Sequence, residues 1–405
     1  MKIGFKEICI NPLKPVKQAG FIQQVDNIFT FHDDLYARIL GLADNKREIY
    51  LCSLDNLGVS EGLTLQQELV EKYRKYTGKQ IIVQISCTHD HFAGYAGDKT
   101  YYKQLFNTLW NAIKSFEFTQ TRLYISHKHV FFDEVGKSRI SHHETPNIFL
   151  DLFELFDKEN RLGTLIVYNC HPTILSGDTP YFSSEYPGYV IKKLKEFNPD
   201  EFFMFFQGAA GDISTRFTRS SQDYKGVEEL GNKLVWKVMS LLKLPDNKKE
   251  IENINFENHI FRLEHSTKPI DLSHLPNDLT ERELETIEIG KKIREKYIAS
   301  KRQLETEINI SRLVLAGYNF IFSPKETFSS YISAIDTNKS VLICYTNGYS
   351  PYIVDINFKG VTYEMFTDTT TEDTKIRMYK LLENLGRWKI NEIVMNACNL
   401  YARML

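Results

Sequence analysis

Residues 80–94 of this 405-residue chain read QIIVQISCTHDHFAG. Four of the first seven are isoleucine or valine, and this continuous apolarity predicts a strand that is buried on both faces. Similar apolar runs recur at residues 162–170, 201–206, 313–322 and 341–345. Helical patterns lie between several of these runs, at residues 65–76, 101–116 and 189–197. The alternation predicts an α/β fold, in which layers of sheet and helix pack against each other.

The composition excludes several classes of protein and of partner. With 42% hydrophobic and 25% charged residues, the chain is neither disordered nor collagen-like nor a coiled coil. Its 50 Lys and Arg against 52 Asp and Glu give a net charge of −2, so no nucleic-acid partner is expected. Six widely spaced cysteines without CxxC pairs disfavour a disulfide scaffold. Because the sequence shows no signal-peptide pattern and no apolar run of the roughly 20 residues that span a bilayer, we expect a cytoplasmic protein without a transmembrane segment.

Residues 245–310 are rich in charged side chains and poor in apolar ones. Within them, Thr280 and Glu283 have the spacing of a helix capping box, which predicts a helix from about Thr280 to Glu307. The charges of this helix are mixed in sign, so we favour a solvent-facing helix over a nucleic-acid-binding arm. The segment is either an insertion or a boundary between two parts of one domain.

Histidines follow two of the predicted strands. His89 and His91 come after the apolar run at residues 80–86, and His171 comes after the run at residues 162–170. Ligands of open α/β sheets bind beyond the carboxyl ends of the strands, so these side chains are expected to meet at one edge. In an extended backbone His89 and His91 face the same side, and imidazole is the commonest zinc ligand. An isolated pair of histidines is more often structural, but a third histidine at another strand end favours a metal site.

Small residues follow a third predicted strand, where residues 207–214 read QGAAGDIS. Such residues can form a tight turn or allow a helix to pack closely on the sheet. The stretch lacks the lysine and the spacing of a phosphate-binding P-loop, and it does not resemble the GxSxG motif of serine hydrolases. Asp212 and Ser214 could instead contribute side chains to a pocket.

Three motifs, in order, resemble those of the neutral or alkaline, non-lysosomal ceramidase family. They read THDHFAGYAG at residues 88–97, NCHPTILSGDTPYFSSEYPGY at residues 169–189 and QGAAGDIS at residues 207–214. Residues 3–12 also resemble the family's entry strand, and DLYAR at residues 34–38 resembles its LYAR element. Members of this family are zinc-dependent amidases that cleave ceramide into sphingosine and a fatty acid. The resemblance covers the catalytic domain, without the C-terminal β-sandwich of the secreted members.

The resemblance implies a set of zinc ligands and a set of catalytic residues. The implied ligands are His89, His171, Glu326 in PKETF at residues 324–328, and Tyr352, the second tyrosine of NGYSPY at residues 347–352. The implied catalytic residues are His91 of the HxH pair, Ser214 of the Gly-Asp-x-Ser element, Tyr363 at the substrate carbonyl and Arg139 near the substrate. Because the implied ligands come from both sides of residues 245–310, we interpret residues 1–405 as a single catalytic domain that contains residues 245–310 as a charged helical insertion.

The function implied by the resemblance is zinc-dependent hydrolysis of an N-acyl amide. The expected substrate is an amphiphilic, ceramide-like molecule, and transient contact with lipid is compatible with it. We expect zinc to activate a water molecule and polarise the amide carbonyl, while His91 and Tyr363 stabilise the developing oxyanion. His91 or a nearby acid then protonates the leaving amine, and Ser214 positions the head group or the water.

Three other functions remain open from the sequence. Thr-His-Asp-His-x-x-Gly after a buried strand also resembles part of the metallo-β-lactamase motif HxHxDH, and two metal ions per chain would favour that class. A sugar deacetylase or an esterase would use the same metal chemistry. With 13% aromatic residues, the chain could also line a cleft that binds lipid without turnover.

Overall fold

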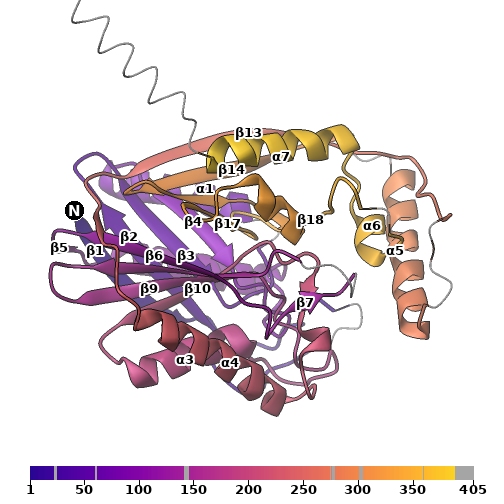
Figure 1. Cartoon of the computed structure of the whole chain (residues 1–405), viewed down its shortest axis with the longest axis horizontal. Helices are drawn as coiled ribbons and strands as arrows, with labels where there is room; N and C mark the ends of the chain where they lie inside the picture. The colour runs from indigo at the N-terminus through magenta and orange to yellow at the C-terminus, as the bar shows by residue number, and fades with distance from the viewer. Residues whose placement is uncertain are drawn as a thin grey trace, which may run out of the picture.

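The computed structural model describes residues 1–21, 25–59, 62–140, 146–273, 275, 279–300, 304–358 and 360–387. Within them, sheets and helices pack in layers, which confirms the predicted α/β fold (Figure 1). No helix in this described part of the chain is long and apolar enough to cross a membrane.

The first sheet contains the strand that precedes the HxH pair. Its order is β4-β3-β2-β1-β5, and β3 and β4 are parallel whereas the other neighbours are antiparallel. The bounds are β1 Lys2–Cys9, β2 Tyr36–Ala43, β3 Glu48–Leu54, β4 Ile82–Cys87 and β5 Thr119–Gln120, with helices α1 Gly62–Thr77 and α2 Lys99–Lys114. Leu65, Leu69 and Tyr73, spaced four residues apart, form the stripe that α1 buries against this sheet.

The second sheet carries the strands that precede His171 and the small residues 207–214. Its order is β10-β9-β8-β6-β12, and β9 and β10 are parallel. The bounds are β6 Tyr124–Phe131, β8 Phe149–Phe156, β9 Arg161–Tyr168, β10 Phe202–Gln207 and β12 Lys249–Glu250, and the short strands β7 Lys137–Ser138 and β11 Ile213–Ser214 pair separately. Helices α3 (Glu185–Phe197) and α4 (Tyr224–Leu242) cover its outer face (Figure 1). Strands β4, β9 and β10 confirm the predicted runs and are buried along most of their length.

The third sheet comes from the C-terminal part of the chain. Its order is β13-β14-β15-β17, and β16 and β18 form a separate parallel pair. The bounds are β13 Asn255–Glu264, β14 Glu305–Leu315, β15 Tyr318–Phe322, β16 Lys325–Thr327, β17 Ser340–Ile343, β18 Ser350–Ile353, α5 Glu281–Ala299, α6 Tyr363–Thr367 and α7 Glu372–Gly386, with short 3-10 helices at Thr215–Phe217 and Ser329–Ala334. One apolar cluster joins the three sheets and includes Leu40, Phe206 and Phe320, so the sheets share a core.

The prediction of one continuous strand at residues 313–322 is wrong, because this stretch contains a hairpin of two strands. It comprises the end of β14 and the whole of β15, which join at Ala316 and Gly317. These two residues have φ angles of 49° and 84°. Positive φ at both central residues is what a two-residue type I′ hairpin requires. The apolar residues on both sides of the turn concealed it in the sequence.

The charged segment at residues 245–310 is not purely helical. Helix α5 has the predicted capping box at Thr280, but it ends at Ala299 rather than at Glu307. Strands β12 and β13 and the start of β14 account for much of the remaining segment. β13 lies at the edge of its sheet, and in its second half exposed side chains alternate with buried ones such as Phe261. The high charge content of the whole segment therefore did not reveal the strand that it contains.

Candidate metal centre

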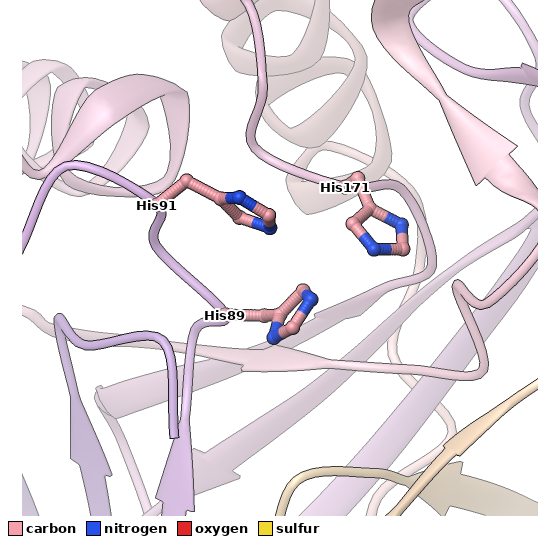
Figure 2. A group of neighbouring side chains, drawn as sticks. All are labelled: His89, His91 and His171. Carbon is pink, nitrogen blue, oxygen red and sulfur yellow. The ribbon is translucent and has the colours of Figure 1, made fainter. Parts of the chain in front are cut away.

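Three histidines lie together where β4 and β9 end. His89, His91 and His171 are buried, and one ring nitrogen from each lies within 4.8 Å of the others. Figure 2 shows that the three rings point toward one another. We predicted an extended backbone at the HxH pair. This prediction is wrong, because His89 has a φ of 64° and the chain turns there. The imidazoles therefore meet through a turn rather than through the alternation of a strand.

Hydrogen bonds to backbone carbonyls determine how two of these rings are protonated. Nδ1 of His89 donates to the carbonyl of Leu57 at 2.9 Å, and Nδ1 of His171 donates to the carbonyl of Ala210 at 2.7 Å. A carbonyl oxygen can only accept, so in the neutral rings Nδ1 carries the proton and Nε2 presents a lone pair. Hydrogen bonds of this kind orient metal-binding histidines in proteins.

Glu326 brings a carboxylate to the same two nitrogens. Its Oε1 lies 2.7 Å from Nε2 of His171 and 3.3 Å from Nε2 of His89. The side chain is almost fully buried on β16. Two lone-pair nitrogens and a carboxylate oxygen repel one another in a buried site unless a proton or a cation lies among them. Two imidazoles and one carboxylate form a donor set that suits Zn²⁺.

The protonation states of these groups also suit a cation. Burial favours a higher pKa for the Glu326 carboxyl, but its two imidazole neighbours, His89 first and then His171, outweigh burial and hold this pKa well below its usual range. Burial, together with the charge of Arg139, lowers the pKa of His171 to about 4. At neutral pH the site therefore holds an ionised carboxylate beside a neutral imidazole, which is the form of these ligands that binds a metal.

His91 differs from the other two histidines in its surroundings. Both of its ring nitrogens are buried and have no hydrogen-bond partner among the described residues. Burial, followed by the nearness of His89 and His171, holds the pKa of His91 well below its usual value, so the ring is neutral. Phe21 packs against it, with 4.9 Å between ring centroids. Unpartnered buried nitrogens cost free energy, so this ring is available for a metal ion, a substrate or a proton in transit.

Two tyrosines reach the same region from β18 and the turn before it. Tyr352 lies directly opposite Glu326 in the parallel pairing of β16 and β18, and its hydroxyl accepts Nη2 of Arg139 at 2.9 Å. Tyr349, which the sequence did not single out, donates its hydroxyl to Oε2 of Glu326 at 3.3 Å. Tyr349 could have been identified from the sequence, because it is the first tyrosine of the Asn-x-Tyr-x-x-Tyr element.

Tyr352 and Tyr363 form the tyrosine side of the centre, and Arg139 links this side to the loop after β10. Its Nη2 donates to the carbonyl of Gly211 at 2.7 Å and lies 3.1 Å from Oε1 of Glu364. Burial opposes the charge of the guanidinium, but Tyr352 and Glu364 outweigh it and raise the pKa of Arg139, which stays charged. Tyr363 begins α6, and its ring centroid lies 6.3 Å from that of Tyr352. Arg139 and Tyr363 therefore both border Tyr352.

Ser214 and Asp212 have different surroundings, although both follow β10. Ser214 is buried, forms a β-bridge with His171, and accepts the N–H of Arg216 on its Oγ at 3.1 Å. The carboxylate of Asp212 accepts the N–H and the hydroxyl of Ser329 at 2.6 and 2.7 Å. Burial, against these hydrogen bonds, raises the pKa of Asp212 to about 6. Ser214 therefore lies beside His171. Asp212 instead hydrogen-bonds the loop after β10 to the short helix that begins at Ser329.

The contacts above connect all eight residues that the family resemblance implied. These are His89, His91, Arg139, His171, Ser214, Glu326, Tyr352 and Tyr363. Their roles as ligands and catalytic groups stay predictions.

Two solved structures share the fold of this chain. The crystal structure of neutral ceramidase from Pseudomonas aeruginosa matches with a TM-score of 0.70 over 95% of this chain and 73% of that chain, at 12% identity. A structure described as ceramidase complexed with C2 matches with a TM-score of 0.71 over 95% of this chain and 74% of that chain, at 11% identity. No protein-family model matches the sequence, and no curated protein sequence matches it. The resemblance that the motifs indicated is thus confirmed at the level of the fold: the chain has a neutral ceramidase-like fold.

Proposed function

We propose that this chain is a zinc-dependent amidohydrolase that cleaves the N-acyl bond of a ceramide-like amphiphile. The observation that carries the proposal is the convergence of Nε2 of His89, Nε2 of His171 and Oε1 of Glu326 in a buried site. This donor set suits Zn²⁺, and the fold is shared with proteins described as ceramidases. In this proposal the chain acts as one catalytic domain that contains the charged segment.

The histidine side of the centre would hold the ion and move protons. His89, His171 and Glu326 would bind zinc, with Tyr352 as a further candidate ligand. Bound zinc would lower the pKa of a water molecule and polarise the amide carbonyl. His91 accepts the proton that the water loses and returns it to the leaving amine, because an amide anion is too basic to leave unprotonated.

The tyrosine side of the centre would bind the substrate. Tyr363 donates its hydroxyl to the developing oxyanion, and Arg139 keeps Tyr352 in place beside it. Ser214, which borders His171, binds a hydroxyl of the head group. Each of these groups is uncharged or already paired, which suits an uncharged amphiphilic amide.

Metal removal and a panel of substrates test the proposal. The purified chain is stripped with a chelator, reconstituted with Zn²⁺, and incubated with ceramides, short N-acyl amides and N-acetyl sugars, while mass spectrometry follows the released acid and amine. We expect activity to be lost on chelation, to return with zinc and to be highest with ceramides. Full amidase activity after removal of every divalent ion would overturn the proposal. Release from N-acetyl sugars alone would indicate a deacetylase, and bound zinc without any release would indicate a binding protein.

A further inference from the structure

A second cluster of metal-ligating side chains lies on two neighbouring strands of the second sheet. β6 and β8 are antiparallel, and His129 lies directly opposite Asp151 in their register. His127 precedes His129 by two positions on β6, so both imidazoles are on the same face of the sheet. One ligand atom from each of these three residues lies within 4.8 Å of the others.

The three side chains meet at one carboxylate oxygen. Oδ1 of Asp151 lies 2.6 Å from Nε2 of His127 and 2.8 Å from Nδ1 of His129. The side chains of His127 and Asp151 are 3% and 8% exposed, and that of His129 is 16% exposed. Phe153 stacks on the ring of His127, with 4.2 Å between centroids, and so fixes its plane. The cluster is therefore held in place and largely shielded from water.

The second nitrogen of His127 limits how the ring can be protonated. Nδ1 of His127 lies 3.2 Å from the carbonyl of Asn338, which can only accept a hydrogen bond. With a proton on Nδ1, Nε2 faces Asp151 either as part of an imidazolium or with a lone pair that a cation must neutralise. The first centre has the same pattern, because His171 donates from Nδ1 to a carbonyl and turns Nε2 toward Glu326.

A small cavity beside the cluster leaves room for one more ligand. Its volume is about 20 Å³, and His129 and Asp151 line it together with apolar side chains such as Ile332 and Leu342. A water molecule needs roughly 10–15 Å³ of such space. The ligand atoms of a tetrahedral zinc ion lie about 3.3 Å apart, so Oδ1 of Asp151 would have to move away from the two ring nitrogens by only about 0.5–0.7 Å.

We propose that His127, His129 and Asp151 form a second site for a divalent transition-metal ion such as Zn²⁺, with a water molecule in the cavity as the fourth ligand. The ion takes the place of the proton between each imidazole and the carboxylate. Two imidazoles and one carboxylate suit Zn²⁺, Co²⁺ or Ni²⁺, whereas Mg²⁺ and Ca²⁺ prefer oxygen ligands.

This second site shares no residue with the first centre, but both contact the loop after β10. Asn169 and Ala209 also line its cavity, and Nδ2 of Asn169 donates to the carbonyl of Ala209 at 3.0 Å. The next residue, Ala210, accepts Nδ1 of His171. An ion there would therefore lie near the loop that positions His171.

Metal titration of the full chain tests this proposal without reference to activity. The protein is stripped with a chelator and titrated with Zn²⁺, and elemental mass spectrometry counts the bound ions. We expect two ions in the wild-type chain, one after Asp151→Asn or His129→Asn, and one after the paired change His89→Ala with His171→Ala. His259→Asn is the matched control, because His259 is a half-buried strand histidine outside both sites and its replacement should leave both ions.

Co²⁺ reports on the second site alone when the first is removed. In the chain with His89→Ala and His171→Ala, Co²⁺ should give the visible absorption of a tetrahedral ion, and Asp151→Asn should abolish it. Circular dichroism checks the fold, and the counts for the wild-type chain and for this paired variant decide the proposal even if Asp151→Asn does not fold. Two ions in His129→Asn, none in the paired variant, or a single wild-type ion that persists in His129→Asn would each overturn it. Loss of both ions in a folded His129→Asn protein would also overturn it, because it would indicate one dinuclear centre.

Discussion

Nε2 of His171 lies 2.7 Å from Oε1 of Glu326, although 155 positions separate the two residues in the chain. The loop between β10 and β11 brings them together. The N–H of Gly211 donates to the carbonyl of Thr327, next to Glu326, at 2.8 Å, while the carbonyl of Ala210 accepts Nδ1 of His171. A Cβ atom at Gly211 would lie 2.9 Å from the Thr327 oxygen, so this approach requires glycine. The small residues of the loop therefore allow two backbones to approach closely.

Replacing the three histidines one at a time should separate them into two classes. His89→Ala and His171→Ala each remove a nitrogen from the donor set and should lose the zinc ion of this centre. His91→Ala should keep that ion and lower turnover by about 10²- to 10⁴-fold, which is the usual contribution of a general acid–base group. Zinc content and hydrolysis rate are measured on the same preparations. Equal zinc loss in all three variants would show that His91 is a ligand.

The sequence predicted the part of the centre that depends on single strands. His89 and His171 follow β4 and β9 within three residues, so the pattern of apolar runs and polar ends locates both. It could not show that Nε2 of each ring faces Glu326, because this depends on the turn at His89 and on hydrogen bonds to distant carbonyls. The direction of a side chain at a turn is set by tertiary contacts.

Features that depend on the pairing of distant strands could not be predicted. The sequence His127-Lys128-His129 is visible in the chain, but only the register of β6 and β8 places Asp151 opposite it. The hairpin at Ala316 was missed for a related reason, because the turn lies inside one apolar run and Ala-Gly is a weaker turn signal than Asn-Gly.

Arg139 should stabilise the protein as well as the tyrosine side of the centre. Arg139→Met leaves the Glu364 carboxylate without its cation in a site where only 9% of that side chain is exposed. Breaking a buried pair costs about 3–5 kcal/mol, and the 18% exposure of Arg139 reduces this, so we expect the free energy of unfolding to fall by about 2–3 kcal/mol. Urea unfolding measures the change, and Glu364→Gln in the same chain should restore part of it. An unchanged urea midpoint in Arg139→Met would contradict a structural role for the pair.

Gly20 should be needed for the position of His91. Its φ is 108°, and a Cβ atom there would collide with Nδ1 of His91. Gly20→Ala should therefore displace the ring and lower turnover on the order of 10- to 100-fold at unchanged zinc content. Gly78→Ala is the matched control, because Gly78 also has a positive φ, 75°, but nothing lies within 4 Å of its Cβ position. Both variants should lose some stability, and only Gly20→Ala should lose activity; equal rates in the two would contradict the role of this contact.

Asp212 should make stability depend on pH in a direction that can be checked. Its pKa rises from 3.8 to about 6 in the folded protein, because burial disfavours the carboxylate more than the hydrogen bonds from Ser329 favour it. A raised carboxyl pKa means that the folded state binds the proton more tightly than the unfolded state does. Its contribution to stability is therefore fully present below pH 4 and is lost as the pH rises from about 4 to about 6.

Asp212→Asn removes this titration while keeping an acceptor for the N–H of Ser329 and a donor for its hydroxyl. At 1.36 kcal/mol for each pKa unit, the shift corresponds to at most about 3 kcal/mol. We expect Asp212→Asn to raise the free energy of unfolding by up to that amount at pH 7.5 and to change it little at pH 4, as measured by urea unfolding at both pH values. A variant that is destabilised more at pH 7.5 than at pH 4 would mean that the Asp212 carboxylate is stabilised by the nearby charge of Arg139 more than burial penalises it.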